Sequence, residues 1–237
     1  MTSEIRNPEL WKDGELKIEW VRRHMPLLAG LEKEFKETKP FKGKKIALSV
    51  HLEAKTAHLC EILAEGGAEM YITGSNPLST QDDIAAALVH EGLNVFAVHG
   101  ATEEEYMHGI RKVIEAGPNI IIDDGGDLVN MIHTEYRELI PNVIGGCEET
   151  TTGILRLEAM NKAGELSNPD YTMSSHLTTA DIAQLESSID TLQSGEYPWA
   201  MNAAITPVST SPLPAVAKPG LPVLLIYTLP SGRTVLV

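Results

Sequence analysis

The chain has 237 residues, of which 43% are hydrophobic and 22% charged, and its formal net charge is −14. This composition is ordinary for a folded globular protein, and the length allows one large domain or one domain with an appendage. The acidity argues against nucleic acid and anionic membranes as partners and favours a small-molecule ligand, although the same charge could serve only solubility.

Two cysteines, Cys60 and Cys147, are too few for a disulfide framework, so we expect a reduced, cytoplasmic protein. The first residues carry no basic segment followed by an apolar stretch, and no signal peptide is expected. The sequence contains no run of about 18 apolar residues, which predicts that no segment spans a membrane.

Residues 15–37 carry apolar side chains at helical spacing, with Pro26 and Gly30 as expected interruptions. From residue 44 onward, short apolar runs alternate with helical patterns. The expected strands cover residues 44–50, 69–73, 93–98, 119–123 and 142–145, and the expected helices cover residues 52–65, 79–90, 102–115, 128–138 and 150–163. This alternation predicts an α/β fold, a doubly wound parallel sheet with helices on both faces.

Two of the expected helices begin with the spacing of a capping box. Thr102 precedes Glu105 by three residues, and Ser79 precedes Asp82 by the same distance, with aspartate in place of the usual glutamate. In this motif each side chain accepts a hydrogen bond from the backbone of the other residue, so we expect both helices to be capped in this way.

The pattern changes after residue 166. Residues 187–237 contain four charged side chains, and half of the chain's 14 prolines follow residue 194. Stretches rich in Ser, Thr, Ala and Pro without helical or alternating periodicity are typical of irregular, partly disordered chain. We therefore predict an α/β domain over residues 1–166 and an irregular C-terminal appendage over residues 167–237.

Ligands of doubly wound sheets bind at the carboxyl ends of the strands. Four polar segments follow the expected strands, at residues 49–55, 74–83, 123–127 and 146–153. The sequence has no Gly-x-Ser-x-Gly elbow, no His-Glu-x-x-His, no Walker loop and no Cys-x-x-Cys. Spacing alone thus predicts a domain that binds a polar ligand.

His51 stands at a junction between an expected strand and helix, where an imidazole suits proton transfer near neutral pH. A lone histidine is more often structural, so the position leaves both interpretations open. Glu53 and Lys55 follow in the first helical turn, either as a solvated surface pair or as polar groups at the edge of a ligand site.

Two further strings are rich in ligand-binding groups. Asp123, Asp124 and Asp127 surround two glycines, and carboxylates so close raise one another's proton affinity, as acid–base catalysis requires. The alternatives are a divalent-metal loop or an acidic turn that caps the next helix. In the second string, Glu148 and Glu149 precede three threonines at a helix start; glutamates can bind sugar hydroxyls, but redundant helix caps explain the pattern equally well.

The segments 51–63, 67–88, 120–136 and 147–160 resemble four blocks of the S-adenosylhomocysteine hydrolase (adenosylhomocysteinase) family, in the family's order and separations. The resemblance implies a homo-oligomeric enzyme that uses tightly held NAD. Its reaction would oxidise the ribose 3′-hydroxyl, eliminate L-homocysteine and add water, which releases the nucleoside. Residues 1–166 would then be the substrate-binding domain.

The resemblance also implies roles for individual residues. His51 and Asp124 match catalytic groups near the 4′ and 5′ carbons, and Glu149 matches the residue that binds the ribose hydroxyls and assists their oxidation. No metal ligands are implied. The implied substrate contacts are Glu53, Lys55, Thr56, Gln81 and His133, and the implied NAD contacts are Thr150, Thr151 and Thr152.

Lys55 departs from many family members, which carry glutamate or glutamine at this position; some archaeal and thermophilic members share the lysine. A lysine can only donate hydrogen bonds, which suits the 6-oxo group of hypoxanthine rather than the adenine amino group. We therefore expect S-inosyl-L-homocysteine to be accepted as well as, or instead of, the adenosyl compound, although Glu53 could still accept the adenine amino proton.

The larger departure follows Leu166. The family's catalytic lysine and aspartate and its Gly-x-Gly-x-x-Gly phosphate loop have no counterpart in this sequence, and residues 227–233 resemble a string that the family places after its NAD domain. The resemblance then leaves three possibilities: a truncated record of the family enzyme, with NAD supplied from elsewhere; a non-catalytic module that binds nucleosides; or a misread, inactive product.

Overall fold

The computed structural model describes residues 2–166, 226–228 and 234–236. The chain divides into two compact units, Met1–Tyr171 and Thr172–Val237. In the second unit, β6 (Ile226–Thr228) and β7 (Thr234–Leu236) pair antiparallel. The rest of the predicted appendage lies outside the described residues, and the predicted boundary at residue 166 stays a prediction.

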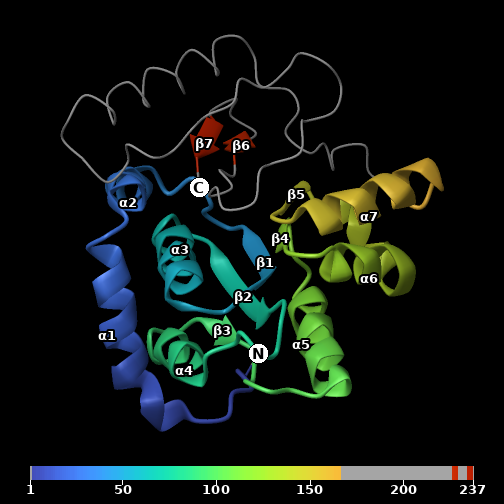
Figure 1. Cartoon of the computed structure of the whole chain (residues 1–237). Coiled ribbons are helices and arrows are strands. Elements are labelled where there is room, and N and C mark those ends of the chain that lie inside the picture. The colour runs from blue at the N-terminus through green and yellow to red at the C-terminus, as the bar shows by residue number, and fades with distance from the viewer. Residues whose placement is uncertain (1, 167–225, 229–233, 237) are drawn as a thin grey trace. The chain divides into compact units, whose positions relative to one another are not determined.

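The first unit is built on a five-stranded sheet in the order β3-β2-β1-β4-β5, in which every pairing is parallel (Figure 1). The central strand pairs on both sides, with Leu48 opposite Ile72 and Ile122. Its residues are buried almost throughout because helices cover both faces of the sheet. The strands are β1 (Lys45–Val50), β2 (Glu69–Gly74), β3 (Asn94–Val95), β4 (Ile120–Asp123) and β5 (Gly145–Glu148).

The helices form a layer on each face of this sheet, which confirms the predicted doubly wound α/β fold (Figure 1). One layer holds α3 (Ala54–Glu65) and α4 (Asp82–His90), with α1 (Trp11–Arg22) and α2 (Pro26–Thr38) packed outside them. The other holds α5 (Glu103–Glu115), α6 (Asp127–Glu135) and α7 (Thr151–Lys162). Two short 3-10 helices, η1 (Pro8–Leu10) and η2 (Arg137–Asn142), complete the unit. None of the helices described here has the length and apolarity needed to cross a bilayer.

The predicted helix boundaries were right in some places and wrong in others. Pro26 interrupts the first helical region as expected and begins α2, but Gly30 lies inside that helix rather than interrupting it. The capping box of Thr102 and Glu105 is confirmed. The box expected at Ser79 does not form, because α4 begins three residues later and the Ser79 hydroxyl donates to a backbone carbonyl instead.

Two strands also differ from expectation. The last strand, β5, begins at Gly145 rather than at residue 142, because residues 137–142 form the 3-10 helix η2. The third strand, β3, contains two residues of the six predicted. Both lie at the edges of the sheet, where fewer neighbours stabilise a strand.

The chain order places a topological switch between β1 and β4. From β1 the chain proceeds outward to β2 and β3, then crosses to β4 on the other side of β1. The connections that follow β1 and β4 therefore diverge, which opens a crevice at the carboxyl ends of these two strands. His51 directly follows β1, and Asp124 directly follows β4.

Candidate functional site

The switch point brings an imidazole and a carboxylate together. His51 Nε2 lies 3.4 Å from Asp124 Oδ2, which also accepts a 2.7 Å hydrogen bond from the hydroxyl of Ser75. The other ring nitrogen, Nδ1, lies 2.5 Å from the hydroxyl oxygen of Ser79. The Asp124 side chain is 6% exposed and that of His51 is 48% exposed. The imidazole is thus held from both ring nitrogens and remains open to a ligand, an arrangement suited to proton transfer.

Glu149 joins this pair from the neighbouring strand. It follows β5, and its backbone N–H donates to Asp123 O at 2.9 Å. Burial, and secondarily the Asp124 carboxylate, raise the pKa of Glu149, while His51 opposes the shift. The three predicted catalytic residues are therefore close enough to influence one another's charge. His51 and Glu149 also line one cavity of about 910 Å³.

Two carboxylates of the acidic loop, which comprises residues 123–127, bind backbone N–H groups and other side chains; they belong to Asp123 and Asp127. Asp123 is fully buried and accepts hydrogen bonds from the N–H groups of Asp124 and Val129, at 3.0 and 2.9 Å. Burial is the main cause that raises its pKa to about 7. Asp127 accepts from the Tyr106 hydroxyl and pairs with Arg156. Within the part of the chain that the structure describes, no cluster of three or more His, Cys, Asp or Glu residues could hold a metal ion.

The two glutamates after β5 have different surroundings. Glu148 Oε1 accepts hydrogen bonds from the backbone N–H groups of Gly125 and Thr150 and from the Thr150 hydroxyl, at 2.8, 2.9 and 2.9 Å. A Cβ atom at Gly153 would overlap the Glu148 carboxyl group, so a larger residue there requires Glu148 to move. Glu148 therefore ties the start of α7 to the acidic loop, a role that the sequence pattern did not reveal.

The threonines at the start of α7 also differ in their surroundings. The Thr150 hydroxyl caps the helix by accepting from the N–H of Gly153 at 3.0 Å. Thr151 and Thr152 are exposed in the first turn. Glu148 and Thr150 bind the N–H groups of Thr150 and Gly153, which leaves the N–H groups and exposed hydroxyls of Thr151 and Thr152 to contact another molecule.

A second group of polar residues gathers at the start of α3 and α4. Glu53 caps α3, and its Oε1 accepts from the N–H groups of Lys55 and Thr56 at 3.0 and 3.2 Å. Gln81 caps α4, and its N–H donates to Leu52 O at 3.0 Å. The exposed Lys55 ammonium projects beyond the helix start, whereas Thr56 is buried.

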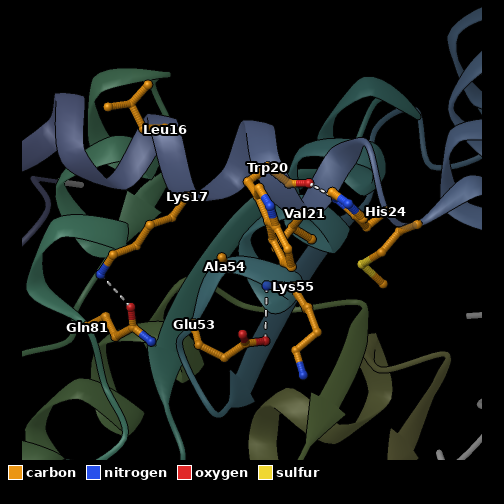
Figure 2. Close-up of a pocket in the computed structure, with 10 residues that line it drawn as sticks. Leu16, Lys17, Trp20, Val21, His24, Glu53, Ala54, Lys55 and Gln81 are labelled. Carbon is orange, nitrogen blue, oxygen red and sulfur yellow. Dashed lines mark hydrogen bonds between the residues drawn. The ribbon is translucent and has the colours of Figure 1, made fainter.

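Lys17 reaches this group from α1. Its ammonium donates to Gln81 Oε1 at 2.9 Å and pairs with Asp83 Oδ2 at 2.6 Å (Figure 2). No local sequence motif predicts that Lys17 belongs to the site. The feature that could have identified it is a lysine on the face of α1 that packs against α4.

Two cavities meet at these residues. One is the cavity of about 910 Å³ that also contains His51 and Glu149, and the other, of about 540 Å³, lies beside Trp20 (Figure 2). The apolar lining of the second cavity comes from Leu16, Trp20, Val21, Met25 and Ala54. Both cavities are lined by Lys17, Glu53, Lys55 and Gln81.

His133 stands apart from this assembly. It lies on α6, is 1% exposed, and its Nδ1 is 2.8 Å from Val129 O. Burial lowers its pKa. Neither of the two cavities is lined by His133, so its expected substrate contact stays a prediction.

The fold is a doubly wound α/β domain with a cavity lined by polar side chains at its switch point. The family model for S-adenosyl-L-homocysteine hydrolase matches residues 2–138. This chain belongs to the S-adenosyl-L-homocysteine hydrolase family.

Curated relatives carry two different names. The S-inosyl-L-homocysteine hydrolase of Methanocaldococcus jannaschii is 56% identical over 166 residues, which cover 70% of this chain and 40% of that protein. The adenosylhomocysteinase of Pyrococcus abyssi is 48% identical over 165 residues, which cover 70% of this chain and 39% of that protein. The adenosylhomocysteinase of Aquifex aeolicus is 47% identical over 170 residues, covering 71% and 41%. The chain thus spans about 40% of the length of the relatives it matches.

Proposed function

We propose that this chain binds the nucleoside part of an S-nucleosyl-L-homocysteine, within an enzyme that hydrolyses this thioether to a nucleoside and L-homocysteine. The proposal is supported by a cavity at the switch point that His51 and Glu149 line, with the Asp124 carboxylate 3.4 Å behind His51. These residues come from the ends of three different strands, as expected for a site that the whole fold positions.

The acid–base roles follow from the surroundings of each group. His51 and Asp124 would move protons at the sugar's 4′ and 5′ carbons, because the imidazole is both oriented and accessible. Glu149 would bind the ribose hydroxyls. Its raised pKa brings the carboxyl group nearer to neutral pH, where taking up and returning a proton is easier.

The base would lie where the two cavities meet, against Lys55, Gln81 and Glu53. The Lys55 ammonium can donate a hydrogen bond to the 6-oxo group of hypoxanthine, whereas the Glu53 carboxylate can accept a hydrogen bond from an N–H group of either purine. We therefore include S-inosyl-L-homocysteine with S-adenosyl-L-homocysteine among the proposed substrates, with Thr56 as a further contact at the start of α3.

NAD is the cofactor that the family resemblance implies, and it would supply reversible uptake of a hydride. The described residues fit only one edge of it. Thr151 and Thr152 offer exposed hydroxyls and N–H groups, but Thr150 already binds the N–H of Gly153, and the Glu148 carboxylate, which binds the N–H of Thr150, would repel a pyrophosphate at this helix start. The sequence also lacks a glycine-rich phosphate loop. We derive no step through NAD from these residues.

A second candidate function is nucleoside binding without turnover. It is favoured by the start of α7, where the Glu148 carboxylate and the Thr150 cap leave little room for a cofactor phosphate. Assembly into homo-oligomers and a cytoplasmic location remain expectations from the resemblance and the composition.

The test combines binding and turnover on the 237-residue chain. Inosine and adenosine are titrated by calorimetry, and free thiol is measured after addition of either S-nucleosyl-L-homocysteine with NAD. Binding with thiol release supports the enzyme, and binding alone supports the second candidate. Glu149→Gln should weaken nucleoside binding, while Glu37→Gln, an exposed change on α2, should not. If neither nucleoside binds, both proposals are wrong.

A further inference from the structure

Lys17 is a donor-only side chain that contacts the one amide group shared by both cavities. We propose that Lys17 is a positioning residue: it fixes the orientation of the Gln81 carboxamide and thereby makes the base site prefer a 6-oxopurine over a 6-aminopurine. The inference rests on the proposed function, because it assigns a purine to this part of the crevice.

The contact itself determines which end of the amide faces the ligand. An ammonium group carries three donors and no acceptor, so the Gln81 atom 2.9 Å from Lys17 Nζ must be the carbonyl oxygen. The amide nitrogen then lies on the opposite side, which Figure 2 shows directed toward Glu53 and away from Lys17. Lys17 is itself anchored by Asp83, whose side chain is 14% exposed.

The rest of Gln81 is already fixed. Its N–H donates to Leu52 O and its carbonyl accepts from the N–H of Ala85, both at 3.0 Å, which holds the residue at the start of α4. Among the rotations open to the side chain, the last one exchanges the amide oxygen and nitrogen. The contact with Lys17 opposes this rotation, because the reversed amide would point a donor at a donor.

The fixed amide makes this wall of the crevice rich in donors. Gln81 Nε2 and the Lys55 ammonium both donate, and Glu53 supplies an acceptor. Hypoxanthine matches this set, since its O6 accepts and its N1–H donates. Adenine places an amino group where hypoxanthine has O6, so it would face the two donors. An amide that could turn would present its oxygen to that amino group and bind adenine better.

A purely structural role for Lys17 predicts something different. As an ion pair between α1 and α4, Lys17 would affect the stability of the fold and the affinity for both nucleosides alike. A change in the ratio of the two affinities distinguishes the roles, because only the orientation of the amide discriminates between the bases.

The experiment measures the dissociation constants of inosine and adenosine by calorimetry on the 237-residue chain. Lys17→Met should lower the ratio of inosine to adenosine affinity by about tenfold, equivalent to about 1.4 kcal/mol. Lys17→Arg also offers only donors and should keep the ratio within about twofold. Lys33→Met, which removes the same charge from an exposed position on α2, is the matched control and should leave the ratio unchanged.

Each result supports or overturns the positioning role of Lys17. An unchanged ratio in Lys17→Met, with a circular dichroism spectrum like that of the unsubstituted chain, overturns the inference and leaves the proposed function standing. Loss of selectivity in Lys17→Arg equal to that in Lys17→Met also overturns it. Failure of the unsubstituted chain to bind either nucleoside overturns the proposed function and this inference together.

Discussion

A single methyl group at residue 153 should destabilise the protein, although helix propensity predicts the opposite. Gly153 lies in the first turn of α7, and replacing a helical glycine with alanine usually stabilises a protein by about 0.5–1 kcal/mol. Here the new Cβ atom would overlap the carboxyl group of Glu148. Either the helix start or Glu148 must move.

The magnitude follows from what Glu148 binds. Its Oε1 accepts from Gly125 N–H, Thr150 N–H and the Thr150 hydroxyl, and these bonds tie the acidic loop to α7. Overpacking costs about 1–3 kcal/mol. Complete loss of one hydrogen bond to a charged group costs about 1.5–3 kcal/mol more. Subtracting the gain in propensity of about 0.5–1 kcal/mol, we expect Gly153→Ala to lower the free energy of unfolding by about 1.5–5.5 kcal/mol if one of these bonds is lost.

Urea unfolding followed by circular dichroism measures this change. Gly30→Ala is the matched control, because Gly30 lies within α2 and a Cβ there would meet no atom within 4 Å. This variant should gain about 0.5–1 kcal/mol. If Gly153→Ala were as stable as Gly30→Ala, the hydrogen bonds of Glu148 would not tie the acidic loop to the start of α7 as described.

Three further predictions concern charge, capping and orientation. The pKa of Asp123 is raised from 3.8 to about 7, so this carboxyl group binds a proton more tightly in the folded state than in the unfolded state. Its contribution to the free energy of unfolding is complete below about pH 4 and is lost as the pH rises through about 7. Asp123→Asn should flatten that part of the profile of unfolding free energy against pH, and an unchanged profile would contradict this reasoning. Thr102→Ala removes the capping box of α5 and should cost about 1 kcal/mol in urea unfolding without changing the affinity for inosine; equal stability would mean that the cap contributes nothing. Ser79→Ala removes the partner of His51 Nδ1 and should weaken inosine binding by about threefold to tenfold at a nearly unchanged thermal midpoint, whereas unaltered binding would show that His51 needs no such support.

The order of elements was predictable because each strand and helix of the first unit carries its own periodicity. The places of His51 and Asp124 were predictable as well, since both directly follow strands of the expected sheet, and their functional roles stay predictions. The edge strand β5 was misplaced, because Gly145, Gly146 and Cys147 give no strand signature of their own.

The remaining features depend on contacts between distant parts of the chain. The sequence left open whether Glu148 binds sugar hydroxyls or caps a helix; its carboxylate also binds the N–H of Gly125, 23 residues away. Lys17 contacts Gln81 across 64 residues, from a helix whose own pattern indicates only an exposed lysine. Such pairings follow from the packing of α1 and α7, which local sequence does not specify.

A crystal structure of the chain with inosine would test the central claim most directly. The account predicts that the ribose lies beside His51, Asp124 and Glu149, with the base against Gln81 and Lys55. A nucleoside found at another surface, or a ribose that contacts none of the three, would contradict it.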